Sequence, residues 1–347
     1  MNLKINIMLY RLSLVFLAQI LVVSSLVSNA FPAEKTPSML PVIPEPVTSF
    51  GATYHKGKVY YYGGHFGQAH RYSTADQANT LWELNLNSYT WEKIGTGPRL
   101  QGLALVGYRN SLYRIGGFTA QNEPGEEHDL WSQKSFARFN LRTKKWEDLA
   151  DLPEGRSSFD ATVSESGMLY VVGGWQMRGD SESIWHLTAW RFDLKNPHGT
   201  WTAIANFPYK RRAISIAPTN EGVVVVGGMQ DTGNITPKTV FYNARDNQWV
   251  DGPELVGESE MTGFGTASCQ IDGSLIVSAY DGTLQTINQD GVFEVVGNSH
   301  EARFFHRVVP TRGKQALILG GANMETGKFD SMESIHLDFL PKLYTPK

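Results

Sequence analysis

The sequence has little cysteine and little net charge, and each of these shortages excludes a class of protein. Its 347 residues include one cysteine, Cys269, which rules out an internal disulfide framework and a multi-cysteine zinc site. Lys and Arg number 31 against 34 Asp and Glu, a net charge of −3 that argues against nucleic-acid binding through bulk charge. Glycine, with 34 residues, and aromatic side chains, at 12%, are plentiful. This composition indicates a globular protein rich in strands and turns.

The first thirty residues form a segment of their own. Lys4 and Arg11 precede an apolar stretch of about sixteen residues that ends at Val27, followed by the small-residue site Ser28-Asn29-Ala30. We expect residues 1–30 to be a secretory signal peptide and the mature chain to be exported, periplasmic or secreted. The alternative is a retained membrane anchor, for which roughly twenty apolar residues are needed. No later segment is expected to span a membrane.

A hydrophobic run that ends in a glycine pair recurs along the chain. It reads VYYYGG at 59–64, LYRIGG at 112–117, LYVVGG at 169–174, VVVVGG at 223–228 and ALILGG at 316–321. The first glycines of consecutive pairs are 53, 57, 54 and 93 residues apart, and the last interval is close to two periods. LIVSAY at 275–280 fits the missing copy, with Ala279 and Tyr280 in place of the glycines. The chain therefore contains six units.

A second landmark keeps the same rhythm. Trp91, Trp146, Trp201 and Trp249 each follow the first glycine of a pair by 22 to 30 residues, and Phe293 holds this place in the fifth unit. Four short apolar runs per unit at a period near 50 are typical of a propeller blade. On these residues the chain resembles kelch-repeat β-propellers along nearly all of its mature length. The resemblance implies an all-β fold with six blades of four antiparallel strands.

The termini indicate how such a ring closes. The segment LPVIP at 40–44 fits the fourth-strand template LADLP at 149–153, so we expect an N-terminal strand to complete the last blade. Residues 31–347 are then one propeller domain. We expect its blades near 49–94, 98–150, 153–206, 208–254, 258–297 and 301–340 plus 38–47.

Arginine recurs at one place between the units. Arg99, Arg156 and Arg303 lie 17 residues before the first glycine of the next pair, and Arg211 lies 16 residues before it with Arg212 beside it. Propeller symmetry predicts a ring of guanidinium groups at one mouth of the channel, which suits a carboxylate, a phosphate or an acidic sugar. The alternative is structural, with each arginine bound to backbone carbonyls or acids between blades.

The segments after the glycine pairs are long, and we expect them to be functional loops on one face. His65 and Trp175 begin two of these loops, and Tyr280 stands in place of the second glycine of the fifth unit, so we take all three as candidate ligand contacts. Glu260 and His306 are candidate acid–base residues. The histidine spacing matches no metal motif, and neither a metal nor a cofactor is predicted.

Two classes of function remain open. The first is an exported binding module for a carbohydrate, an anionic small molecule or a protein partner. The second is a sugar-active enzyme, because the chain resembles N-acetylneuraminate epimerase in plan. That resemblance implies a carboxylate-binding arginine, Arg156 or Arg303, near Glu260 or His306. Galactose oxidase is also similar in its kelch propeller, but its copper site needs a Cys-Tyr crosslink, and we expect Cys269 to be a buried, inert thiol.

Overall fold

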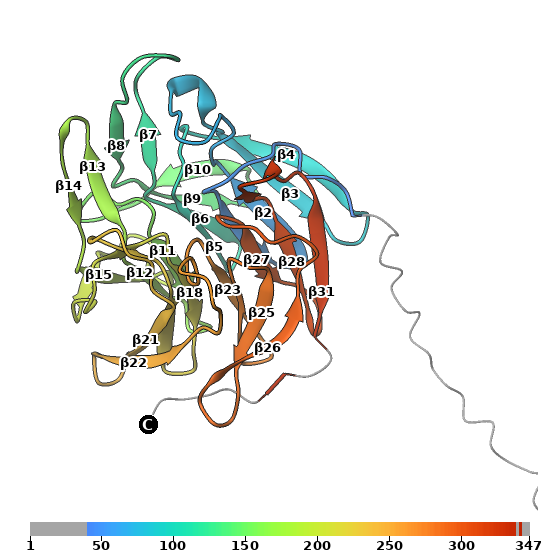
Figure 1. The fold of residues 1–347 in the computed structure, drawn as a ribbon. Coiled ribbons are helices and arrows are strands. Elements are labelled where there is room, and N and C mark those ends of the chain that lie inside the picture. Colours follow the sequence, from blue (N-terminus) through green and yellow to red (C-terminus); the bar gives the residue numbers. More distant parts are fainter. Residues whose placement is uncertain (1–39, 338–339, 342–347) are drawn as a thin grey trace, which may run out of the picture. The chain divides into compact units, whose positions relative to one another are not determined.

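The computed structural model describes residues 40–337 and 340–341, and the predicted signal peptide lies outside this range. The described residues fold into antiparallel sheets arranged around a common centre (Figure 1), where the innermost strands contact one another. The described helical structure is one short 3-10 turn, η1 (Thr74–Asp76), and no helix in this part of the chain is long and apolar enough to cross a membrane.

Five of the six blades have four described strands each, in the order in which the chain runs outward from the channel. Blade one contains β1 (Gly51–His55), β2 (Lys58–Tyr62), β3 (Thr80–Asn85) and β4 (Thr90–Thr96). Blade two contains β5 (Ala104–Tyr108), β6 (Ser111–Ile115), β9 (Phe136–Asn140) and β10 (Lys145–Asp148). Blade three contains β11 (Asp160–Val163), β12 (Met168–Val172), β15 (Ala189–Asp193) and β16 (Thr202–Ile204).

The remaining blades follow the same plan. Blade four contains β18 (Ser215–Pro218), β19 (Gly222–Val226), β21 (Lys238–Asn243) and β22 (Gln248–Glu254). Blade five contains β23 (Ala267–Ile271), β24 (Ser274–Ser278), β25 (Thr283–Ile287) and β26 (Phe293–Asn298). Blade six contains β27 (Arg307–Pro310), β28 (Gln315–Leu319) and β31 (Met332–His336). The innermost strands of successive blades contact one another, and β27 contacts β1, which closes the ring and confirms the predicted six-bladed propeller.

The second strand of each blade is buried on both faces, which explains its mainly apolar sequence, although β6 also contains the buried Arg114. In β2, Val59 and Tyr61 pack into one interblade core, while Tyr60 and Tyr62 pack into the next. Successive side chains of a strand point to opposite faces, so a strand between two cores needs apolar residues at every position.

The glycine pairs end these strands where neighbouring blades approach most closely. Gly116 has φ +54, and a Cβ at this position would lie 2.6 Å from the carbonyl oxygen of Arg156 in the next blade. The recurrent tryptophans join blades as well. The indole of Trp201 donates to the carbonyl oxygen of Ala150 at 2.8 Å, and Trp249 donates to Ala205 at 2.8 Å.

Two of the expected loops are instead β-hairpins. The segment after the second glycine pair forms β7 (Phe118–Ala120) and β8 (Leu130–Ser132), and the next forms β13 (Trp175–Arg178) and β14 (Ser181–Trp185). Together they make a separate sheet in the order β14-β13-β8-β7, which stands at the upper left of Figure 1. Shorter pairs are formed by β17 (Arg211–Arg212) with β20 (Met229–Gln230) and by β29 (Ala322–Asn323) with β30 (Gly327–Lys328). The propeller therefore carries an additional four-stranded sheet built from the segments that follow the second strands of blades two and three.

The described N-terminal residues lie against the last blade, as expected, although residues 40–44 are not a strand. The backbone N–H of Ile43 donates to Asp330 at 2.8 Å, and the equivalent bond in blade two runs from Leu152 to Lys134. Ile43 packs in the same core as Leu319 of blade six. The residues that align with β10 precede residue 40 and lie outside the described range.

Candidate functional site

A ring of left-handed backbone surrounds the channel just before the innermost strands. One residue per blade has φ between +50° and +62°: Ser49, Gly102, Ser158, Ala213, Gly265 and Phe305. At five of the six blade junctions a backbone N–H of one member donates to the carbonyl of its neighbour in the preceding blade, at 2.6–3.3 Å. We call these six residues the left-handed ring. Four of them are not glycine, and such a conformation is unfavourable for them unless the surrounding contacts impose it.

A cavity of about 380 Å³, the upper cavity, opens at the level of this ring. All six ring residues line it, together with Tyr72, Phe118, Trp175 and Met229 from the segments after the glycine pairs, so it lies at the long-loop end of the channel. Its charged or titratable lining residues are Arg212, Arg307, His70 and His306, with the phenol of Tyr72, and no described carboxylate lines it. The cavity is therefore electropositive in a protein whose net charge is −3.

Arg212 is positioned by the wall of this cavity. It pairs with Met229 between β17 and β20, and its guanidinium carbon lies 4.3 Å from the centre of the Trp175 ring. Its side-chain hydrogen bond runs to the Met229 sulfur at 3.0 Å, a weak acceptor, and its Nε has no partner among the described residues. Burial lowers the pKa of Arg212, and Tyr72 opposes this shift. This cation lacks a strong acceptor.

His306 immediately precedes β27, the innermost strand of blade six. Blades one to four carry an apolar side chain at the equivalent position, after the left-handed ring: Phe50, Leu103, Phe159 and Ile214. His306 is 2% exposed, and neither ring nitrogen has a partner among the described residues. Burial, followed by the charges of Arg303 and Arg307, lowers its pKa to about 3. The cavity wall thus contains a neutral imidazole at neutral pH.

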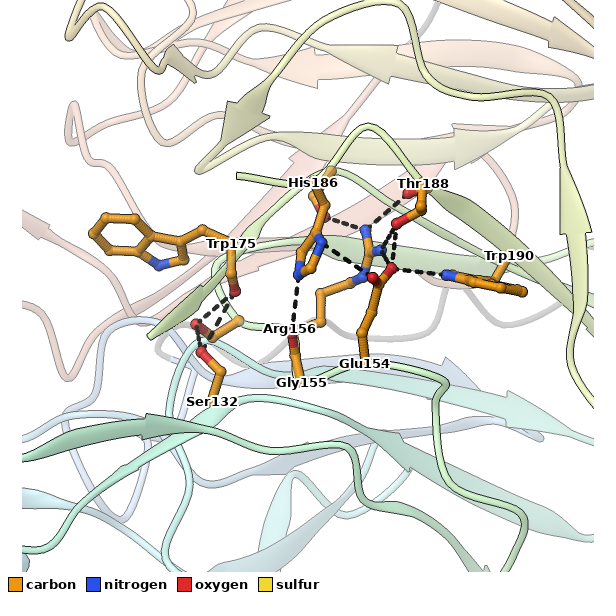
Figure 2. Close-up of polar contacts among 10 residues, drawn as sticks. Ser132, Glu154, Gly155, Arg156, Trp175, His186, Thr188 and Trp190 are labelled. Atoms are coloured by element: carbon orange, nitrogen blue, oxygen red, sulfur yellow. Dashed lines mark hydrogen bonds and ion pairs between the residues drawn. The ribbon is translucent and has the colours of Figure 1, made fainter. Parts of the chain in front are cut away.

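The predicted guanidinium ring takes a different form. Arg156 is fully buried and donates from Nη1 to the carbonyl of Gly173 at 2.6 Å and from Nη2 to Glu154 at 2.5 Å and to Thr188 at 2.6 Å. Figure 2 shows this cluster, where His186 also lies beside Glu154, with Nδ1 3.5 Å from its carboxylate. These groups lie between blades and do not line the upper cavity.

Of the other predicted arginines, two are buried like Arg156 and one is exposed. Arg303 donates to the carbonyls of Gly320 and Ser331 and pairs with Glu333, and Arg211 donates to the carbonyl of Lys238 at 3.0 Å. Both are at most 1% exposed. Arg99 is exposed and stands one residue out of register, because Leu100 occupies the position of Arg156 relative to the left-handed ring. Ligand binding by these four arginines stays a prediction, and their contacts support the structural alternative.

The remaining predicted site residues are dispersed. Trp175 lines the upper cavity. His65 is buried and does not line it, and its Nε2 lies 2.8 Å from the carbonyl of Arg71. Tyr280 stacks on Phe304 outside the lining, with ring centres 5.9 Å apart. Glu260 is exposed and does not line the cavity. The structure therefore brings together Arg212, Trp175 and His306 from the predicted set.

Two contributors were not predicted. Gln101 lines the cavity, is 1% exposed, and its side-chain nitrogen has no partner among the described residues. Arg307 lies at the cavity floor, where its Nη1 is 2.9 Å from Oδ1 of Asp160. Both occupy fixed positions relative to the left-handed ring. Aligning the units on that ring, rather than on the glycine pairs, is the signal that finds them.

No model of a protein family matches the chain. The chain is 27% identical over 205 residues to "Kelch-like protein terF" of Aspergillus terreus, which covers 57% of this chain and 43% of that protein. It is 26% identical over 199 residues to "Kelch repeat and BTB domain-containing protein 12" of Homo sapiens, covering 54% and 31%, and 26% identical over 257 residues to "Alpha-scruin" of Limulus polyphemus, covering 66% and 26%. The aligned regions span less than half the length of these relatives.

A solved structure of YjhT has the same fold. The two superpose with a TM-score of 0.69 at 14% identity, over 86% of this chain and 97% of that one. Together with the repeat and the six sheets, these likenesses establish that the chain is a kelch-repeat β-propeller and a distant homologue of kelch-repeat proteins.

Proposed function

We propose that this propeller binds a small acidic sugar in the upper cavity. The observation that carries the proposal is the charge of the lining, which includes two guanidinium groups and no described carboxylate. A partly buried cation is costly unless it is paired, and among the described residues the Arg212 side chain stacks on Trp175 and Trp185 but hydrogen-bonds only to a thioether. A ligand carboxylate supplies the missing acceptor, and guanidinium groups bind carboxylates through paired hydrogen bonds.

The shape and surface of the cavity support a sugar as the rest of the ligand. A volume of about 380 Å³ lies within the range of small-molecule sites. The lining includes the aromatic side chains of Trp175, Phe118, Phe264 and Phe305, which offer flat apolar faces to a sugar ring. Gln101 and Ser158 stand among them as polar groups for hydroxyls. With the predicted signal peptide, the proposal describes an exported binding protein, periplasmic or secreted.

The second candidate is an enzyme that epimerises or mutarotates an acidic sugar. His306 favours it through its position, because it is an imidazole in the cavity wall whose ring nitrogens have no partner among the described residues, but a pKa of about 3 makes it a weak base at neutral pH. Glu260 lies outside the cavity lining and supplies no matching acid there. Binding of an acidic sugar is therefore the function that we propose, and catalysis is the second candidate.

Isothermal titration tests binding. The purified protein is titrated with N-acetylneuraminate, glucuronate and galacturonate, and with glucose as the neutral comparison. We expect an acidic sugar to bind and Arg212→Gln to weaken its binding at least tenfold, while Arg142→Gln, at an exposed position, leaves the affinity unchanged. Failure of every acidic sugar to bind rejects the proposal and directs the search to a protein partner.

NMR tests catalysis in the same samples. Exchange between the α and β anomers of the bound sugar is measured with and without protein. Acceleration that His306→Gln abolishes at unchanged affinity supports the enzyme, whereas an unchanged exchange rate leaves a binding module.

A further inference from the structure

One position of the repeat is small in four blades and charged in the other two. Two residues after the left-handed ring, the six blades carry Gly51, Ala104, Asp160, Ser215, Ala267 and Arg307. The charged pair belongs to blades three and six, which are three steps apart in a ring of six and therefore face each other across the channel. The small residues of the other blades leave room for the two side chains to meet.

Arg307 is held by several blades at once. Its Nη1 donates to Oδ1 of Asp160 at 2.9 Å, its Nε to the carbonyl of Phe50 at 2.9 Å, and its Nη2 to the carbonyl of Leu103 at 3.3 Å. The second oxygen of Asp160 accepts the backbone N–H of Ile216 at 3.2 Å. The pair thus connects blades six, one, two, three and four, and fixes the guanidinium near the channel axis.

The pair also divides the channel. Below it lies a second cavity of about 210 Å³, the lower cavity, lined by residues of the innermost strands. Arg307 lines both cavities, whereas Asp160 lines the lower one alone. The charge partner of this guanidinium therefore lines the lower cavity, whereas the upper cavity, which Arg307 lines together with His306 and the left-handed ring, has no acid in its described lining.

We infer that Arg307 is a second contact for the acidic sugar and that Asp160 is the residue that positions it. The inference rests on the proposed function. A guanidinium carries five N–H groups, and three have described partners here, which leaves two for a ligand. With Arg212 in the wall and Arg307 at the floor, the cavity binds the sugar at two points, through its carboxylate and through a second oxygen.

Titrations of N-acetylneuraminate and glucuronate into four variants test this assignment. Arg307→Lys keeps the positive charge but loses the planar set of guanidinium N–H donors, and we expect the acidic sugar to bind with at least a tenfold weaker Kd. Asp160→Asn removes the charge that holds Arg307, and we expect a Kd about three- to tenfold weaker. The exchange of both residues, Asp160→Arg with Arg307→Asp, restores an opposite pair but places the cation on blade three. We expect it to recover the melting temperature lost in Arg307→Asp alone without recovering the Kd.

A wild-type measurement keeps the inference testable where a variant does not fold. In protein labelled with 15N-arginine, the Nε–H signal of Arg307, assigned by its loss in Arg307→Lys or by through-bond spectra of the wild type, should move on addition of the sugar. The signal of Arg142 should not move.

The outcomes separate the inference from the proposed function. If no acidic sugar binds the wild type, both are rejected. If Arg212→Gln abolishes binding while Arg307→Lys or the exchanged pair binds as the wild type does, the inference alone is wrong and the pair serves only to close the channel. A static Arg307 signal in saturated protein leads to the same conclusion.

Discussion

The guanidinium of Arg307 and the carboxylate of Asp160 meet 2.9 Å apart although 147 residues separate them in the chain. Removing one partner leaves the other as an unpaired buried charge. We expect Arg307→Ala to destabilise the protein by about 3–5 kcal/mol, whereas adding Asp160→Ser, which gives every blade a small residue, should recover part of the loss. Urea denaturation of the two single variants and the double variant measures the coupling. Strictly additive losses would show that the pair contributes nothing as a pair.

The interblade arginines should stabilise the fold in proportion to their burial. Arg156→Ala removes donors from Glu154, Thr188 and a glycine carbonyl, and we expect a loss of about 3–5 kcal/mol. Arg99→Ala is the matched control, because Arg99 is exposed and its loss should cost under about 1 kcal/mol. Equal melting temperatures for the two variants would contradict a structural role for the buried arginine. Chemical denaturation of both variants gives the comparison.

The fold could be predicted from the sequence because its signal is local and repeated. A strand buried on both faces must be apolar throughout, and a close approach of two backbones requires glycine, so each unit carries its own mark. The fifth unit was recognisable through spacing alone, since Ala279 and Tyr280 replace the glycines.

The site could be predicted only in part, because it consists of departures from the repeat. His306 and Arg212 stood out as residue types, but their shared cavity depends on which residue of each unit precedes the innermost strand. Counting back from the glycine pairs placed Arg99 with Arg156, although the structure aligns Leu100 with Arg156. Asp160 and Arg307 stand out only when the units are aligned on the left-handed ring, and their contact exists only once the ring has closed.

His306 should make the fold sensitive to acid. Its pKa is lowered from 6.5 to about 3, chiefly by burial. Between these values the unfolded chain binds a proton that the folded chain excludes, so stability falls as the pH drops from 6.5 toward 3, by at most about 1.4 kcal/mol per pH unit. His306→Leu, which copies Leu103 of blade two, should flatten this dependence in urea denaturation at pH 7, 5.5 and 4. His198→Gln, at an exposed position, should leave the slope unchanged, and an unchanged slope in His306→Leu would contradict the assignment.

Ala213 is a strained member of the left-handed ring. Its φ is +53°, and blades two and five already carry glycine at this place. A left-handed conformation costs an L-residue roughly 1–2 kcal/mol of stability. Replacing alanine by glycine removes this cost but lowers the stability by about 0.5–1 kcal/mol, because glycine increases the entropy of the unfolded chain. We expect Ala213→Gly to raise the stability by about 0.5–1 kcal/mol. Ala217→Gly in strand β18 should lower the stability. A loss of stability in both variants would show that the packing of the Ala213 methyl group outweighs the strain of its backbone.

The N-terminal segment should contribute to ring closure through its buried side. Ile43 is 2% exposed, and its backbone N–H donates to Asp330 beside blade six, whereas the adjacent Val42 is 57% exposed. Ile43→Ala should therefore cost about 2–5 kcal/mol, and Val42→Ala should stay within about 0.5 kcal/mol of the wild type. Deleting residues 31–47 should lower the melting temperature further, because Val47, which is fully buried, is lost as well. A deletion variant that melts with the wild type would show that blade six and blade one close the ring without this segment.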